Sequence, residues 1–154
     1  MNRGTGQYKV RKGEESDLDD MLRLLGILFS VEQDFSFDET KQRQGLKMLL
    51  NEPDNCCIMV AEHEHRVIGM CTAQILISTA EGGRSALLED VVVEEAYRKQ
   101  GIGKDLLEGM EKWAVARGAK RCQLLADQDN ENALIFYEKS GWQVTHMINL
   151  RKSF

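Results

Sequence analysis

Two closely spaced glycines lie where a predicted strand, residues 87–93, leads into a predicted helix, residues 102–117. Gly101 and Gly103 permit unusual backbone angles and the close approach of a ligand. The unpaired N–H groups of a first helical turn, together with the helix dipole, attract anions. This combination predicts a site for a pyrophosphate group. Three cations accompany the glycines: Arg98, Lys99 and Lys104.

Two common phosphate-binding sequences do not fit this segment. A P-loop requires Ser or Thr after its Gly-Lys pair, but Asp105 follows Gly103-Lys104, and position 98 lacks the earlier glycine. The dinucleotide fingerprint requires a third glycine where Leu106 stands. A lone Gly-x-Gly is also typical of a plain tight turn, which stays the alternative at this point.

A second segment, residues 130–142, combines a polar start with an aromatic helix face. Asn130 precedes Ala133, Phe136 and Tyr137, and Gly141 follows. An aromatic residue on an apolar helix face usually packs in a core. A functional role for Tyr137 is the alternative at this point.

Taken together, these segments resemble the GNAT superfamily of acyl-CoA-dependent N-acetyltransferases. The first matches Arg/Gln-x-x-Gly-x-Gly/Ala, and the second matches Asn-x-x-Ala-x-x-Phe-Tyr-x-x-x-Gly-Phe, with Trp142 for the last Phe. A proline common in the family is replaced by Glu95. The resemblance implies an α/β (α+β) fold with a central, mostly antiparallel mixed sheet, splayed between two parallel strands and flanked by about four helices. It also implies acetyl transfer from acetyl-CoA to a primary amine by direct attack in a ternary complex, without a metal.

The resemblance assigns roles residue by residue. Tyr137 is the expected acid for the departing thiolate of coenzyme A, and a backbone N–H near residues 91–93 is expected to polarise the thioester carbonyl. The expected acetyl-CoA contacts are Val91, Val92, Val93, Arg98, Lys99, Gln100, Gly101, Ile102, Gly103, Lys104, Asn130, Ala133, Phe136 and Tyr137.

The residue that removes a proton from the attacking amine stays open. Alternation along a strand puts Glu89 on the same face as Val91 and Val93, so it is one expected base, acting through water. Asp90, on the opposite face, is the competitor. Either carboxylate can instead be structural, and an amine that is already neutral needs no base.

An acidic and aromatic stretch is the candidate acceptor region. In this superfamily the acceptor enters beside the first two helices, where Glu32 and Asp34 suit a cationic amine; a solvated acidic loop is the alternative. Asp90 is a further candidate substrate contact. Neighbours in the expected region are Phe35, Phe37, Glu81 and Arg84.

The rest of the chain supplies the elements that position these residues. Helical periodicity and a capping box at Ser16-x-x-Asp19 predict a helix from residue 16. The strand 87–93, its helix and the strand 120–126 form a β-α-β unit, whose strands should be parallel. The other predicted elements are a strand over 7–12, a helix over 39–51, a hairpin of 56–62 and 66–78, a helix over 130–140 and a last strand over 142–150.

Length and charge limit the class of protein. The chain has 154 residues and a formal charge of −5, which predicts one domain, residues 1–154, and argues against nucleic-acid binding. No apolar run approaches the length of a signal peptide or a bilayer span, so we expect a cytoplasmic protein without membrane contact.

The four cysteines are expected to be free thiols, and His63 and His65 to border a hairpin turn rather than bind a metal.

Three functions remain in competition. The first is acetylation of a small-molecule amine, the second is acetylation of a protein lysine or N-terminus, and the third is a non-catalytic acetyl-CoA sensor. Homodimers are common in the superfamily, so a second copy of the chain is a candidate partner.

Overall fold

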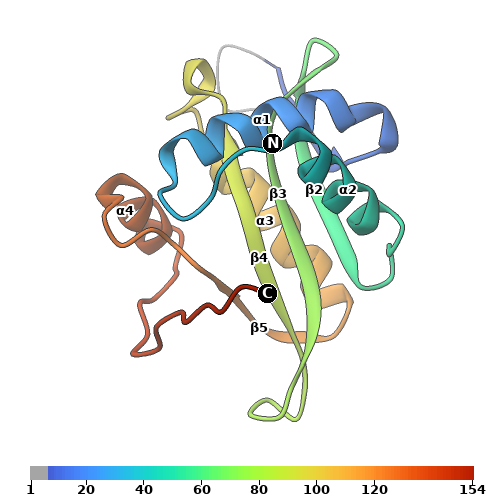
Figure 1. Ribbon diagram of the computed structural model, residues 1–154. Coiled ribbons are helices and arrows are strands. Elements are labelled where there is room, and N and C mark those ends of the chain that lie inside the picture. The colour runs from blue at the N-terminus through green and yellow to red at the C-terminus, as the bar shows by residue number, and fades with distance from the viewer. Residues whose placement is uncertain (1–6) are drawn as a thin grey trace. The chain divides into compact units, whose positions relative to one another are not determined.

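The structure is a computed structural model that describes residues 7–154 and divides into two compact units, residues up to 123 and residues 124–154. The first unit is built on a five-stranded sheet (Figure 1). Its strands follow one another in chain order, antiparallel from β1 to β4, and β5 pairs in parallel with β4. The strands are β1 (Lys9–Lys12), β2 (Cys56–His63), β3 (Arg66–Ser78), β4 (Gly83–Val93) and β5 (Ala119–Leu124).

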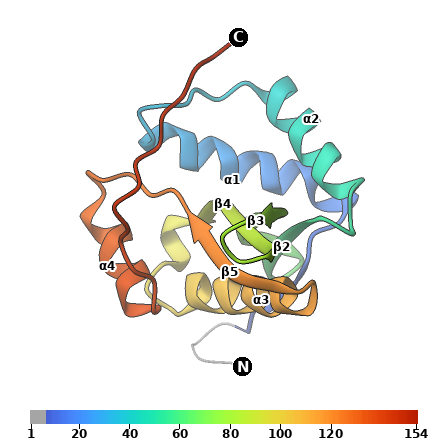
Figure 2. The ribbon, with the colours of Figure 1, turned by 90° about the horizontal axis from the view of Figure 1, so that it is seen from below.

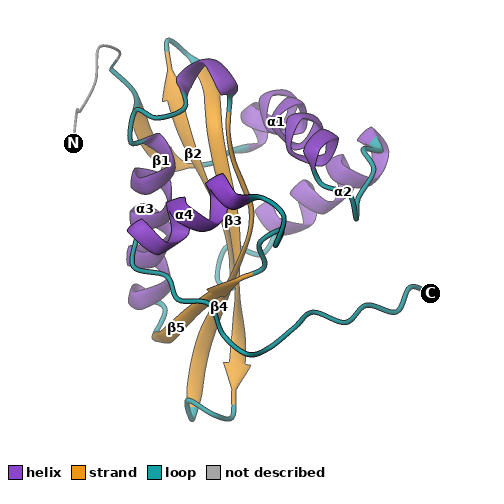
Figure 3. Ribbon diagram, turned by 90° about the vertical axis from the view of Figure 1, so that its left-hand side faces the viewer, coloured by secondary structure: helices purple, strands orange, loops and turns teal. Residues whose placement is uncertain are grey.

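Helices cover both faces of this sheet (Figures 2 and 3). The amphipathic helix α1 (Leu18–Val31) and helix α2 (Glu39–Leu50) lie on one face, and α3 (Ile102–Ala116) lies on the other. The α1 face buries Ile58, Val60, Met70 and Val92 against leucines of α1 and Leu46 of α2. The α3 face buries Leu106, Leu107 and Met110. The predicted helices, the hairpin and the parallel β4–β5 pair are therefore confirmed.

The start of α1 differs from the predicted cap. A short 3-10 helix, Glu15–Asp17, precedes α1, and the capping box joins Glu14 to Asp17 rather than Ser16 to Asp19. The Asp17 carboxylate is buried and accepts the Glu14 N–H at 2.8 Å. Arg11 of β1 also donates both terminal nitrogens to it, at 2.8 and 2.9 Å. The ion pair with Arg11 therefore places Asp17, rather than Asp19, in the capping box. The spacing of residues near the helix start does not reveal this, because Arg11 lies in another element.

We predict that Arg11→Ala lowers the free energy of unfolding by about 2 kcal/mol, because it leaves the Asp17 carboxylate buried without its counter-charge. For a chain of this length that corresponds to a Tm lower by roughly 4–8 °C, measurable by thermal denaturation. Arg11 bridges two acids, because its Nε also donates to Glu62 at 3.0 Å. Arg43→Ala is the matched control, since Arg43 likewise bridges Asp19 and Glu39, but on the exposed surface. An equal loss of Tm in both variants would contradict the prediction.

The second unit contains one helix, α4 (Glu131–Lys139), which ends before Gly141 at a φ of +91°. The prediction of a strand over residues 142–150 is wrong, because this segment of the described chain has no regular secondary structure. A strand needs the hydrogen bonds of a neighbouring strand, and alternation in the sequence cannot supply one. Within residues 7–154, every helix is too short or too polar to span a bilayer.

Candidate functional site

The segment after β4 forms an open loop at the N-terminus of α3. A short 3-10 helix, Glu95–Tyr97, leads into it, and α3 begins at Ile102. Lys99 and Gly101 both have positive φ, +63° and +88°, so the loop turns twice in the left-handed region. The first helical hydrogen bond runs from the Asp105 N–H to the Gly101 carbonyl, at 3.0 Å. The amides of residues 102–104 consequently lie outside the ladder of the helix.

The space outside Gly101 is empty. A Cβ atom built on Gly101 meets no heavy atom within 4 Å. An anion can therefore approach the amides at the positive end of the helix dipole. Ile102 contributes only its backbone to such a site, because its side chain is 1% exposed and lies beside Gly69. The geometry fits the pyrophosphate site that the sequence predicts.

The loop cations have different surroundings. The Nε of Arg98 donates to the carbonyl of Val93 at 2.9 Å, so this guanidinium also closes the loop on the strand that precedes it. Lys104 lies 3.8 Å from the Glu108 carboxylate one turn later. Arg98, Lys99 and Lys104 are all exposed.

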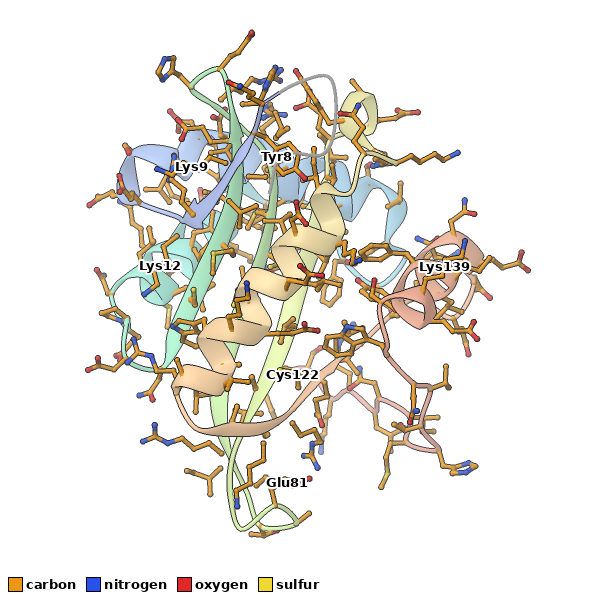
Figure 4. All side chains as sticks on the ribbon, turned by 180° about the vertical axis from the view of Figure 1, so that it is seen from behind. Tyr8, Lys9, Lys12, Glu81, Cys122 and Lys139 are labelled. Atoms are coloured by element: carbon orange, nitrogen blue, oxygen red, sulfur yellow. The ribbon has the colours of Figure 1, made fainter. Side chains whose placement is uncertain are left out.

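One acid lies in the first turn of α3, and it is held by a tyrosine. The hydroxyl of Tyr8, just before β1, donates to the Asp105 carboxylate, and Figure 4 marks Tyr8 beside the start of α3. Burial and the neighbouring carboxylate raise the pKa of Tyr8 to about 12. The carboxylate in the first turn of α3 is therefore engaged by a neutral donor.

An ionic anchor that no sequence pattern predicts lies at the start of the loop. Glu94, directly after β4, accepts from Arg23 of α1 at 3.0 Å and from Arg66 of β3 at 3.1 Å. Arg23 also donates to the Val67 carbonyl at 2.7 Å, and Asp20 accepts the Val67 N–H at 2.9 Å. Helix α1 is thereby tied to the beginning of the loop. No short motif marks this set, because its members come from three elements.

A β-bulge interrupts β4 just before the loop. Met70 pairs with Val92 and Thr72 pairs with Glu89, so Cys71 alone faces Asp90 and Val91. Asp90 has a φ of +53°. One extra residue in a strand disrupts the ladder locally and leaves backbone groups without a cross-strand partner. The strand end that includes Val91, Val92 and Val93 thus offers backbone groups beside the loop.

The bulge also corrects the expected orientation of the two carboxylates. Paired residues point to the same face, so Glu89 shares the face of Thr72 and Val92, rather than that of Val93. The Asp90 carboxylate lies on that face too, since it accepts from the Thr72 hydroxyl at 3.0 Å. The prediction that alternation separates Glu89 from Asp90 is wrong, because the inserted residue changes the period. Glu89 is exposed and Asp90 is half-buried.

Burial raises the pKa of Asp90 to about 6; the hydrogen bond from Thr72 opposes the shift and the charge of Glu89 adds to it. The folded state therefore binds a proton more tightly than the unfolded state, and this contribution to stability is lost as the pH rises from about 4 to about 6.

We predict that Asp90→Asn, which carries no charge, is more stable than the wild type at pH 8 by about 2 kcal/mol. The advantage should shrink below pH 5, where the wild-type carboxyl is protonated. Thermal melts of both proteins between pH 8 and pH 5 measure the difference in stability. A stability advantage of Asp90→Asn that grows as the pH falls would contradict the prediction.

The candidate acceptor residues lie in two places. Glu32 is the C-cap of α1, and Asp34 and Phe35 follow in an irregular segment. The ring of Phe35 lies 5.6 Å from that of Phe29 in α1, centroid to centroid. Glu81 lies at the tip of the β3–β4 hairpin and Arg84 close to it, at the opposite end of β4 from the glycine loop (Figures 1 and 4). Glu81 pairs there with Arg121 at 3.3 Å. The expectation that Glu81 and Arg84 neighbour the other acceptor residues is wrong, because β4 is longer than predicted and carries them away.

The second unit holds the aromatic motif. The Asn130 side chain accepts the Ala133 N–H at 3.1 Å, so Asn130 is the N-cap of α4. The ring of Tyr137 lies 5.2 Å from that of Phe136 and 6.2 Å from that of Trp142, centroid to centroid. All three rings are half-buried. Packing therefore fixes the phenol ring at the end of a short helix.

Residues 7–154 contain no group of three or more His, Cys, Asp or Glu side chains arranged to hold a metal ion. His63 instead lies 2.9 Å from the Gln7 carbonyl, and Glu64 and His65 form the hairpin turn at positive φ. The four cysteines are free, as predicted.

Known proteins resemble this chain in sequence and in fold. Residues 18–142 match the acetyltransferase (GNAT) family. The chain is 31% identical over 143 residues to a glucosamine 6-phosphate N-acetyltransferase of Trypanosoma brucei brucei, with 88% of each protein covered. Its fold matches the crystal structure of a glucosamine-6-phosphate N-acetyltransferase from Arabidopsis thaliana, with a TM-score of 0.77, 26% identity and coverage of 96% and 99% of the two chains. It also matches an aminoglycoside acetyltransferase from an uncultured soil metagenomic sample, in complex with sisomicin, with a TM-score of 0.74, 26% identity and coverage of 94% and 97%. The chain is therefore an acyltransferase and belongs to the acetyltransferase (GNAT) family.

Proposed function

We propose that this enzyme, a single GNAT domain of the cytoplasm, moves an acetyl group from acetyl-CoA to a primary amine of a small molecule, by direct attack in a ternary complex. The observation that carries the proposal is the open anion site at the start of α3, with its left-handed Gly101, in a chain of this family. Acetyl-CoA presents the pyrophosphate that this site suits.

Donor binding follows from the elements that surround the loop. The amides of residues 101–104 bind the pyrophosphate, and the exposed cations Arg98, Lys99 and Lys104 neutralise its charge. The backbone of residues 91–93 pairs with the amide groups of the pantetheine arm, much as a neighbouring strand would. Asn130, Ala133 and Phe136 of the second unit are the further proposed contacts.

The chemistry requires two proton transfers. The amine nitrogen forms a bond to the thioester carbonyl carbon, and the carbon–sulfur bond then breaks. A backbone N–H of the β4 bulge stabilises the oxyanion. Tyr137 donates its proton to the departing sulfur. Glu89, exposed and free to work through water, takes the proton of the amine; Asp90 and an amine that arrives neutral are the alternatives.

Relatives indicate which amines to test first. The names of two of them specify glucosamine 6-phosphate and aminoglycosides, both of which are amino sugars. We therefore propose amino sugars as the first acceptor class. Two hypotheses compete with this one. The first is acetylation of a protein lysine or N-terminus, and the second is a sensor that binds acetyl-CoA without turnover.

An assay of thiol release from acetyl-CoA with a panel of amines tests the function. We expect turnover with at least one amino sugar and little with lysine-containing peptides. Faster turnover on peptides would replace the small-molecule acceptor with a protein. Tight acetyl-CoA binding without release on any acceptor would favour the sensor.

We predict that Glu32→Ala or Asp34→Ala raises the KM for a cationic amine roughly tenfold, because a charge-assisted contact worth about 1.4 kcal/mol is lost. The KM for acetyl-CoA should change little. Steady-state kinetics with each substrate varied in turn measures both. Asp54→Ala is the control, an exposed acid that pairs with Arg117. If neither Glu32→Ala nor Asp34→Ala changes the acceptor KM, Glu32 and Asp34 do not belong to the acceptor site.

We also propose that the enzyme is a homodimer. The segment 142–154 exposes several large apolar side chains, which a second copy could cover. Light scattering after gel filtration should give twice the chain mass, and a monomer at micromolar concentration would contradict the proposal. The exposed residues are Val144, Met147, Ile148, Leu150 and Phe154.

A further inference from the structure

Asp90 occupies a backbone conformation that a residue other than glycine rarely adopts. Its φ of +53° lies in the left-handed region, which is unfavourable for an ordinary residue and somewhat less so for Asp or Asn. The residue is also in the middle of a long strand, not in a terminal turn. Strain of this kind persists only where surrounding contacts enforce it.

Asp90 contacts a hydroxyl group on the neighbouring strand β3. Thr72 is 4% exposed, and its Oγ1 donates to Oδ2 of Asp90 at 3.0 Å. Asp or Asn in this conformation commonly bonds to its own local backbone. Here the carboxylate reaches across the ladder to β3, and a bond to a charged acceptor is stronger than one between neutral groups.

We propose that Thr72 and Asp90 form a cross-strand brace that holds the β4 bulge open, and that Asp90 is a positioning residue rather than the base. The proposal rests on the proposed function, since an open bulge matters only if a thioester lies against it. Without the brace, β4 relaxes toward a regular strand whose N–H groups turn to β3. The oxyanion then loses a donor, which typically lowers kcat by about 10²–10³-fold.

The arrangement favours positioning over proton transfer. One carboxylate oxygen of Asp90 is already occupied by Thr72, whereas Glu89, its neighbour on the same face, is exposed. In the brace, residue 90 needs only a side-chain oxygen that accepts the Thr72 hydrogen bond, and the uncharged Asn provides one. A residue that takes the proton of the amine needs the negative charge of the carboxylate. The two roles therefore make opposite predictions for Asp90→Asn.

Kinetics of matched variants provides the test. Thr72→Val removes the hydroxyl at constant shape and should lower kcat by about 100-fold, with the KM for acetyl-CoA within about threefold of the wild type. Thr72→Ser should restore kcat to within about threefold. Asp90→Asn should stay within about fivefold with an unchanged pH profile of kcat, whereas Asp90→Ala should resemble Thr72→Val. Ser85→Ala, which removes a buried hydroxyl of β4 instead of the β3 hydroxyl of Thr72, is the control and should have wild-type kcat.

Two outcomes would overturn the brace. One is full activity of Thr72→Val; the other is an Asp90→Asn enzyme as inactive as Asp90→Ala, which would make Asp90 the base. Amide hydrogen exchange of residues 89–92, measured without substrate, separates this proposal from the proposed function. Thr72→Val should slow exchange there, because amides that turn to β3 become hydrogen-bonded, and Thr72→Ser should not, even if the wild type acetylates no amine. Unchanged exchange in Thr72→Val would overturn the brace whatever the activity.

Discussion

Gly101→Asp is expected to weaken acetyl-CoA binding by at least about 100-fold while the chain still folds. The new carboxylate projects into the open space beside the start of α3, where the pyrophosphate is proposed to bind. Like charges brought together at a binding site cost several kcal/mol, and about 3 kcal/mol corresponds to this loss of affinity. Titration calorimetry with coenzyme A measures the effect directly.

Helix α3 provides its own control at the other end. Gly118 has a φ of +85°, close to the +88° of Gly101, and a Cβ on either glycine meets no atom within 4 Å. Gly118→Asp therefore introduces the same side chain with similar backbone strain, but away from the loop. It should bind coenzyme A like the wild type. Equal binding by both variants would show that the pyrophosphate lies elsewhere.

Tyr137→Phe is expected to lower kcat by about 10²–10⁴-fold, the range that general acid catalysis provides, while acetyl-CoA still binds. The substitution removes only the hydroxyl, so the ring keeps its packing against Phe136 and Trp142. The sulfur must then leave as a thiolate or take its proton from water. Steady-state kinetics gives kcat, and calorimetry confirms that the donor still binds.

Tyr97→Phe is the control for this experiment. Tyr97 lies in the 3-10 helix before the glycine loop, and its ring centroid is 5.5 Å from that of His63. Loss of its hydroxyl should leave kcat within a few-fold of the wild type. A Tyr137→Phe enzyme with undiminished kcat would reduce Tyr137 to a packing residue.

Local patterns in the sequence predicted the elements with strong periodicity. The leucines of α1, the hairpin of β2 and β3 and the glycine-marked start of α3 all depend on neighbours within one or two turns. Gly101 was identified because a left-handed turn into a helix demands glycine, and the structure has that turn.

Features that depend on distant partners could not be predicted. The bulge at Asp90 adds one residue opposite Cys71, which alternation along β4 alone does not reveal, and it changed the face assigned to Glu89. Arg11 selects Asp17 as the capping residue from another element. The anchor of Glu94 depends on Arg23 and Arg66, which are remote in sequence.

Following an isotope label from acetyl-CoA into glucosamine 6-phosphate and other amines tests the central claim most directly. We predict that the labelled acetyl group appears on the amine nitrogen in equal amount to the free coenzyme A released. Release of coenzyme A with the label recovered as acetate would show hydrolysis, and binding without release would show a sensor. Either result would contradict an N-acetyltransferase of small amines.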